Sequence, residues 1–254
     1  ALTTYHPRYK SLGTKVDDDY IELNTAIIQI ENEYYSSIRP KRIVGSGERP
    51  INALREKGIE YVEIRALDNN IYDPYGISNE TAIFLESFLF YCLLSEDQPC
   101  EQDEIKKIQS NWGNVVLCGR DKDLKLDFKD GSTFLRDKAA RIIEEMANLE
   151  SRIGDHEYKA IFKRSLETQQ NKVNNSNRTP SGKLLEEITS SGTTWDEYTD
   201  QVAKNHKEEI LKLNREVGYL EKQARDSLEE FRRKESEEEK DFDSFLAEYL
   251  SAIE

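Results

Sequence analysis

Residues 58–68 read GIEYVEIRALD, and this stretch decides how the first third of the chain is interpreted. Apolar and polar side chains alternate along it, as they do in a β-strand whose two faces differ. Val62 and Ile64 share one face, while Glu63 and Arg65 share the other with Tyr61. The alternation predicts a strand over 58–67 with a carboxylate and a guanidinium about 7 Å apart on its polar face.

A second alternating stretch lies upstream, where residues 25–35 read TAIIQIENEYY. Its apolar face carries Ile28, and its polar face carries Glu31 and Tyr35, so the pattern predicts another strand. Residues 39–50 between the two stretches read RPKRIVGSGERP, a basic connection punctuated by Gly and Pro. We therefore expect residues 1 to about 75 to be rich in strands.

Charge restricts the class of ligand. The 254-residue chain has 36 Lys and Arg against 50 Asp and Glu, a formal net charge of −14. Such a field repels phosphate backbones and anionic lipids, so we expect neither nucleic acid nor a membrane as partner. Arg39, Lys41 and Arg42 form the most basic short stretch of this acidic chain, which favours a small anionic ligand.

The sequence also indicates which metal ion could bind and in which compartment of the cell the protein is expected. Three histidines lie far apart and three cysteines form no C-x-x-C pair, so zinc spacing is absent from the sequence. A metal would have to bind through carboxylates, which favours Mg²⁺ or Mn²⁺. The sequence has neither the basic and apolar opening of a secretory signal nor an apolar run of membrane-spanning length. We expect a cytoplasmic protein with reduced thiols.

From residue 76 the hydrophobic period becomes that of helices, and the whole sequence is therefore predicted to be α+β. A charged loop is predicted at 120–132, and residues 171–182, NKVNNSNRTPSG, have the composition of a linker. The predicted divisions are a strand-rich part over 1–75, a helical packing region over 76–170, the linker over 171–182, and charged C-terminal helices over 183–254.

The spacing of Glu63 and Arg65 leaves two interpretations open. One is a solvated or cross-strand ion pair, which is common on sheet surfaces and contributes little. The other is a nucleotide site, in which the carboxylate holds a hard cation and the guanidinium meets phosphate oxygens. A metal and an arginine together would neutralise charge on a transferring phosphoryl group.

The residues then show a family resemblance. QIENEYYSSIRPKR at 29–42 resembles the I-E-N-E-x-Y-x-x-I-R-P-K-R stretch of bacterial glutamate–cysteine ligases of the gamma-proteobacterial type. GSGE at 45–48 continues that stretch, and residues 58–68 resemble the family's G-[IV]-E-Y-[IV]-E-[IV]-R-x-L-D strand. The resemblance implies ATP-dependent joining of the γ-carboxyl of L-glutamate to the amine of L-cysteine through a γ-glutamyl phosphate, the first step of glutathione biosynthesis. It also implies a glutamine-synthetase-like antiparallel sheet over residues 1–75.

Matched residue by residue, the resemblance implies roles for the polar face. Glu63 corresponds to a metal-ligand glutamate, and Arg65 to the arginine that contacts the transferred phosphate. Tyr35 corresponds to a tyrosine of the cysteine pocket. The basic run is implied to bind substrate without individual roles; it comprises Arg39, Lys41 and Arg42.

The resemblance also implies that a partner is needed. Members of the family are about twice as long, and the similarity begins in their second half, so we expect a C-terminal half that requires the N-terminal half and is inactive alone. Two alternatives stay open: another carboxylate–amine ligase of the same fold acting on a different amine, and a non-catalytic helical interaction fragment.

Overall fold

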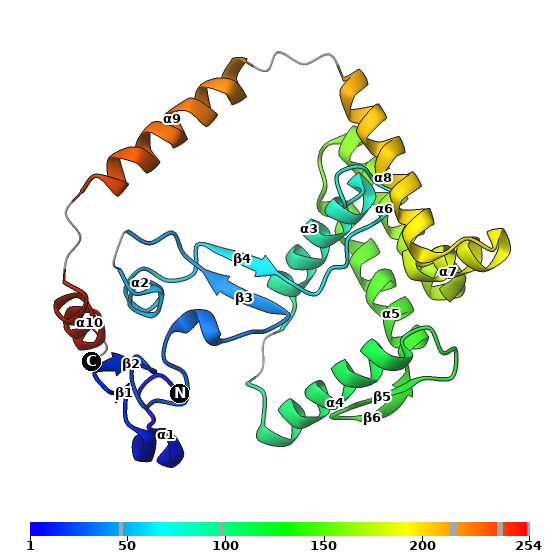
Figure 1. Ribbon diagram of the computed structural model, residues 1–254. Helices are drawn as coiled ribbons and strands as arrows, with labels where there is room; N and C mark the ends of the chain where they lie inside the picture. Colours follow the sequence, from blue (N-terminus) through cyan, green and yellow to red (C-terminus); the bar gives the residue numbers. More distant parts are fainter. Residues whose placement is uncertain (46–47, 97–98, 214–217, 238–240, 253–254) are drawn as a thin grey trace. The chain divides into compact units, whose positions relative to one another are not determined.

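The structure is a computed structural model that describes residues 1–45, 48–96, 99–213, 218–237 and 241–252 (Figure 1). The chain divides into two compact units, Ala1–Asp68 with Glu216–Glu254, and Asn69–Arg215. This division differs from the predicted one, because the C-terminal segment groups with the N-terminal part instead of with the helices that precede it. No helix in the described ranges is long and apolar enough to cross a membrane.

The first unit combines short strands with helices. Its elements are α1 (Pro7–Leu12), β1 (Lys15–Val16), β2 (Asp19–Tyr20), the 3₁₀ helix η1 (Glu31–Glu33), β3 (Ile38–Lys41), α2 (Pro50–Lys57), β4 (Tyr61–Ile64), α9 (Gly218–Glu235) and α10 (Phe242–Ser251). Pro50 begins α2, where its fixed φ suits a first helical residue. Gly58 ends α2 with a φ of +74°, in the region that favours glycine.

Strands β3 and β4 pair antiparallel, which confirms a strand within 58–67 but shortens it to four residues. Arg39 lies opposite Glu63, and Lys41 lies opposite Tyr61. Residues directly opposite one another in an antiparallel pair point to the same face. The register therefore brings the basic residues of β3 to the face of β4 that carries Glu63.

The predicted strand over 25–35 is wrong. The segment contains an isolated bridge between Ala26 and Tyr5, followed by η1. Side chains here bond to the nearby backbone in place of a neighbouring strand. Asn24 accepts from the amide of Ala26 and donates to the carbonyl of Gln29, whose side chain accepts from the amide of Leu23. Such local bonds compete with a sheet ladder.

The second unit is mostly helical and holds the main hydrophobic core. Its elements are α3 (Asn79–Leu94), α4 (Gln102–Cys118), β5 (Lys125–Phe128), β6 (Gly131–Phe134), α5 (Leu135–Ala147), η2 (Asn148–Arg152), α6 (His156–Asn174), η3 (Ser176–Arg178), α7 (Pro180–Ser191) and α8 (Trp195–Lys212). Buried Ile143 and Met146 of α5 pack with Phe162 and Leu166 of α6, and aromatic side chains of α3 cover this cluster.

The charged loop predicted at 120–132 contains a hairpin instead. Strands β5 and β6 pair through a tight turn that ends at Gly131, whose φ is +127°. The hairpin is held against α4, because the side-chain amide of Asn111 both accepts from and donates to the backbone of Asp127, at 2.9 and 2.7 Å. The charged composition of 120–132 did not predict this strand pairing. The hairpin depends on Asn111, which lies 16 positions before Asp127.

The predicted linker over 171–182 is also different in the structure. Helix α6 continues to Asn174, and α7 begins at Pro180. The short connection is ordered by caps, since the Asn175 side chain accepts from the amide of Asn177 and the Thr179 hydroxyl accepts from the amide of Gly182. Asn, Thr and Pro are residues of helix ends as well as of linkers, and here they perform the first role.

Candidate active site on the β3–β4 ladder

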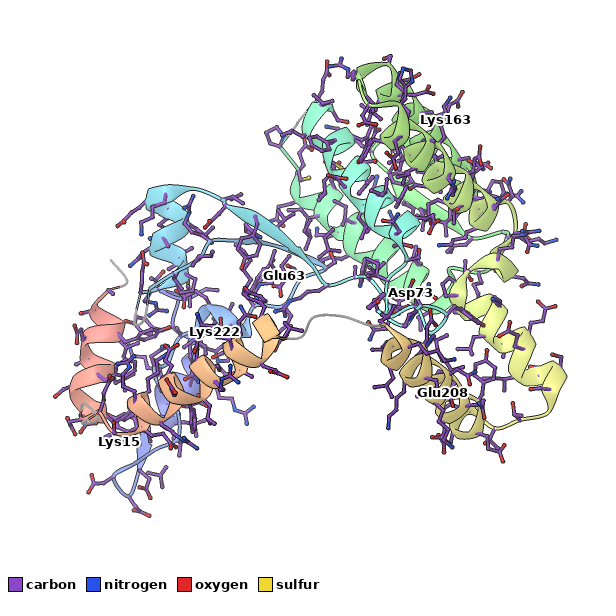
Figure 2. All side chains as sticks on the ribbon, turned by 90° about the horizontal axis from the view of Figure 1, so that it is seen from above. Lys15, Glu63, Asp73, Lys163, Glu208 and Lys222 are labelled. Atoms are coloured by element: carbon purple, nitrogen blue, oxygen red, sulfur yellow. The ribbon has the colours of Figure 1, made fainter. Side chains whose placement is uncertain are left out.

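Glu63 lies on β4 (Figure 2). Its carboxylate lies between two cations, Arg65 and Lys41. Its Oε2 is 3.1 Å from Nε of Arg65 and 3.6 Å from Nζ of Lys41, and its Oε1 accepts from Nη2 of Arg65 at 3.3 Å. All three side chains are half-buried. The hydrogen bond from Arg65 is the largest cause of the lowered pKa of Glu63, so the carboxylate is ionised at neutral pH.

Tyr35 joins this group through its ring. The guanidinium carbon of Arg65 lies 5.3 Å from the ring centroid, within the range of a cation–π contact. Tyr35 is 76% exposed, so most of its ring and its hydroxyl remain accessible. The structure thus places Tyr35 beside Arg65, although no regular strand carries Tyr35.

Arg39 adds a fixed positive charge. The residue is only 8% exposed, and its Nη2 donates to the carbonyl of Glu31 at 3.1 Å. Its Cα lies opposite that of Glu63 in the ladder. Arg39 therefore belongs to the same face as Glu63, with its guanidinium oriented by the backbone of η1.

Arg42 is used differently. Its Nε and Nη2 donate to the carbonyls of Gly58 and Lys57, each at 2.6 Å, and its Nη1 lies 3.7 Å from the carboxylate of Glu60. These carbonyls are at the C-terminal end of α2, where a cation is favoured by the helix dipole. Arg42 thus fastens α2 to the end of β3, which leaves less of its guanidinium for a ligand.

A cavity of about 780 Å³ adjoins the ladder in the first unit. Lys41, which also pairs with Glu63, lines it together with Arg39 and Arg42. Arg55 and Tyr61, which the sequence did not single out as site residues, line it too. The volume falls within the usual range for small-ligand pockets, about 300–1,000 Å³. Most of its charged lining is basic, which suits an anion.

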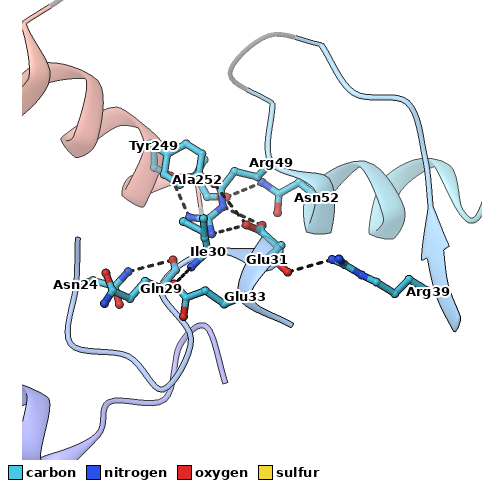
Figure 3. A network of polar contacts seen from close by, with 10 residues as sticks. All are labelled: Asn24, Gln29, Ile30, Glu31, Glu33, Arg39, Arg49, Asn52, Tyr249 and Ala252. Carbon is cyan, nitrogen blue, oxygen red and sulfur yellow. Dashed lines mark hydrogen bonds and ion pairs between the residues drawn. The ribbon is translucent and has the colours of Figure 1, made fainter. Parts of the chain in front are cut away.

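An ion pair between Glu31 and Arg49 links the segments next to this cavity (Figure 3). Arg49 is 1% exposed and donates to both oxygens of Glu31, while its guanidinium carbon lies 4.3 Å from the ring centroid of Tyr249 in α10. Asn52 of α2 donates to the carbonyl of Ala252 at 2.6 Å. Both Glu31 and Arg49 lie in the motif-bearing region, and their charged groups pair with each other.

At this site a metal ion would find one carboxylate ligand, Glu63. Within the described ranges, no three His, Cys, Asp or Glu side chains are grouped so that they hold a metal ion. Oε2 of Glu63 is buried and lies 3.1 Å from Nε of Arg65 and 3.6 Å from Nζ of Lys41, so a metal ion would share this oxygen with two cationic side chains. Lys41 and Arg65 leave the immediate group with a net positive charge, so any bound Mg²⁺ needs further anionic ligands.

Comparison with known proteins shows which proteins this chain is similar to. The family model described as glutamate-cysteine ligase matches residues 1–115. The chain is 37% identical to the glutamate–cysteine ligase of Pseudomonas entomophila over 100% of its own length and 48% of that protein, and 36% identical to that of Bordetella petrii over 100% and 49%. The chain therefore spans about half the length of the curated relatives it matches.

Solved structures show the same relationship. The crystal structure of a glutamate–cysteine ligase from Francisella tularensis in complex with AMP matches with a TM-score of 0.86 and 30% identity, over 98% of this chain and 50% of that one. A bifunctional glutathione synthetase from Pasteurella multocida matches with a TM-score of 0.55 and 19% identity, over 71% and 22%, which is a likeness of fold alone. Along its whole length, the chain is similar to the C-terminal half of bacterial glutamate–cysteine ligases.

Proposed function

We propose that this chain supplies the C-terminal part of an active site that ligates the γ-carboxyl of L-glutamate to the amine of L-cysteine, with hydrolysis of ATP to ADP and phosphate. The observation that carries the proposal is the carboxylate of Glu63 held between Arg65 and Lys41 beside a basic cavity. The whole-length similarity to named ligases supports it. The cytoplasmic location expected from the sequence suits a reaction that uses ATP and a reduced thiol.

In the proposed reaction, a glutamate γ-carboxylate oxygen attacks the γ-phosphorus of ATP and ADP leaves. The amine of cysteine then attacks the acyl carbon, phosphate leaves, and the amine loses a proton. Arg65 and Lys41 would stabilise the negative charge on the phosphoryl oxygens, since preorganised cations act most strongly where charge develops. Glu63 would contribute one ligand to Mg²⁺ or Mn²⁺, which shields the phosphate charges when bound.

We place the nucleotide in the cavity beside β3. Lys41 faces both the cavity and Glu63, so phosphates held in the cavity would extend toward the proposed metal ligand. Arg39 and Arg55 offer further positive charge, and Arg42 a smaller share because α2 occupies it. The AMP in the Francisella tularensis structure supports nucleotide binding by a similar protein.

Tyr35 is proposed to line the cysteine side of the site. Its ring contacts Arg65, so an amine acceptor packed on Tyr35 would lie beside the group that holds the acyl phosphate. The large exposed fraction of Tyr35 leaves this side open for the upstream half to complete. The same half would extend the β3–β4 ladder into the larger glutamine-synthetase-like sheet and supply the remaining metal carboxylates.

The test combines this chain with the upstream half of the Pseudomonas entomophila ligase. The two halves are supplied once as separate chains and once as a single fused chain. ADP release is measured with glutamate, cysteine and Mg-ATP. The chain alone is expected to be inactive, and the joined protein active only with both amino acids. In the joined protein, R65M is expected to lower kcat by about 100-fold or more, the loss typical for one charge-stabilising donor. E63Q is expected to raise the Mg²⁺ concentration needed for half-maximal rate.

The matched control is E56Q, an exposed carboxylate of α2, which is expected to leave both readouts unchanged. Activity of the purified chain alone would contradict the need for an upstream half. A folded joined protein that releases ADP with another amine, and not with cysteine, would favour the alternative ligase. No ADP release with any amine would remove the catalytic proposal.

A further inference from the structure

The second unit contains a cavity of its own, distinct from the ladder site. It has a volume of about 530 Å³ and lies against the outside of the hydrophobic core. Phe84 and Phe88 of α3, with Ile142 and Ile143 of α5, provide an apolar floor. A floor of this kind suits the hydrocarbon or aromatic body of a ligand.

Two of the polar side chains that α6 places in the cavity lining, Lys172 and Gln169, hold donors without a protein partner. Lys172 donates to Oε1 of Gln169 at 3.2 Å, which fixes the amide orientation because an ammonium group has no acceptor. Nε2 of Gln169 is then left buried and without a hydrogen-bond partner in the described structure. Lys172 is half-buried and has two further N–H donors, so the pair together can donate to the acceptor of a ligand.

The surrounding charge is positive. Arg120, Lys122 and Arg136 line the cavity with Lys172, whereas Asp121 is the sole carboxylate among the described lining residues. Lys172 has no carboxylate within ion-pair distance in the described ranges. Burial accordingly lowers the pKa of Lys172 without any opposing anion. A positive cavity with uncompensated donors is notable in a chain whose net charge is −14.

We propose that this cavity binds a small organic acid, with its apolar body on the Phe84–Phe88 floor and its carboxylate accepting from Lys172 and Gln169. A carboxylate offers about four lone-pair sites, enough for both side chains. The cavity volume is within the usual range for such ligands. All residues of this site belong to the second unit. A negative result here would therefore leave the ligase proposal unaffected, and the reverse also holds.

The test uses naphthalene-2-carboxylate and its neutral analogue naphthalene-2-carboxamide, titrated calorimetrically into the folded full chain near neutral pH. Because the two probes share an apolar body, their affinity ratio isolates the carboxylate. The wild-type chain is expected to prefer the carboxylate by about tenfold or more, the usual effect of a charge-assisted hydrogen bond. No binding at millimolar concentration, or equal affinities, would overturn the proposal.

Three variants locate the site. K172M keeps the length of the side chain and removes its charge, so it is expected to abolish the preference while leaving carboxamide affinity unchanged. A139F extends a side chain from α5 into the cavity and is expected to weaken both probes. K163M removes an exposed charge elsewhere on α6 and is expected to change neither. A carboxylate preference that persists in folded K172M would contradict the assignment, even if A139F fails to fold.

Discussion

Arg49 and Glu31, 18 residues apart, form a two-bond ion pair at 3.0 and 2.9 Å whose guanidinium is fully buried. Arg49 also donates to the carbonyl of Tyr249 at 3.3 Å, and the Tyr249 hydroxyl bonds to the same glutamate at 3.4 Å. One arginine thus connects the η1 segment, the start of α2 and the C-terminal helix α10. These are the segments that flank the basic residues of β3.

Replacing Arg49 by Met is expected to destabilise the first unit by about 3 kcal/mol, since it leaves the buried Glu31 carboxylate unpaired. Hydrogen exchange over α2 and α10 should accelerate. Both tryptophans, Trp112 and Trp195, lie in the second unit, so their fluorescence should show an unchanged unfolding transition there. The control R55M alters an exposed arginine of α2 and should change stability by less than about 0.5 kcal/mol. Equal exchange in both variants would show that the pair stabilises nothing.

The Glu31–Arg49 pair also predicts that the stability of the first unit falls at acid pH. Burial alone would raise the pKa of Glu31, but hydrogen bonds from Arg49 and from backbone amides, with the charge of Arg49, lower it overall. A lowered folded-state pKa gives stability that is complete above the unfolded value of about 4.3 and is lost as pH falls through the folded value.

Hydrogen exchange over α2 should therefore differ strongly between wild type and E31Q at neutral pH, and the difference should shrink below about pH 4. Protonated Glu31 resembles Gln in shape and charge, which is why the two proteins should converge. A difference that stays constant with pH would show that Glu31 does not titrate in this range.

The sequence predicted β4 correctly because the alternation of Val62 and Ile64 with polar neighbours is local information. The same alternation failed at 25–35, where Asn24 and Gln29 bond to the backbone. Side-chain competition of this kind cannot be read from a period-two pattern, since it depends on which donors a turn brings within reach.

The candidate site was predictable in its composition and less so in its arrangement. Strand parity alone put Glu63 beside Arg65, and the structure has them in contact. That Lys41 meets Glu63, while Arg42 turns to the end of α2, depends on the register of two strands about 20 residues apart. The buried position of Arg49 was likewise not predictable, because an arginine in a basic loop is usually solvated.

The carboxylate of Glu187 in α7 should hold α8 in place. It accepts from the hydroxyls of Tyr72 and Tyr198, and Lys183 lies 3.7 Å from it. Y198F should destabilise the second unit by about 1.5–3 kcal/mol, the usual contribution of a hydrogen bond to a charged group. Fluorescence of nearby Trp195 follows the loss. In an E187Q background the same substitution should matter less, and an unchanged effect there would show that Tyr198 acts through another contact.

Two helical glycines should respond oppositely to alanine. Within a helix, alanine is favoured over glycine by about 1 kcal/mol, so propensity alone predicts that both substitutions stabilise. At Gly113 in α4 a Cβ would meet nothing within 4 Å. At Gly182 in α7 a Cβ would lie 2.5 Å from the carbonyl oxygen of Ser176 and 2.8 Å from Cα of Asn177, both backbone atoms that cannot rotate away.

G113A is therefore expected to raise the free energy of unfolding of the second unit by about 0.5–1 kcal/mol, whereas G182A should lower it by about 1–3 kcal/mol. Urea unfolding followed by tryptophan fluorescence measures both in one unit with one probe. The opposite signs would reflect the backbone atoms that lie close to Gly182 in the first turn of α7, since no atom lies within 4 Å of a Cβ at Gly113 in the interior of α4. Stabilisation by G182A would mean that η3 does not pack against α7 as closely as the Ser176 carbonyl indicates.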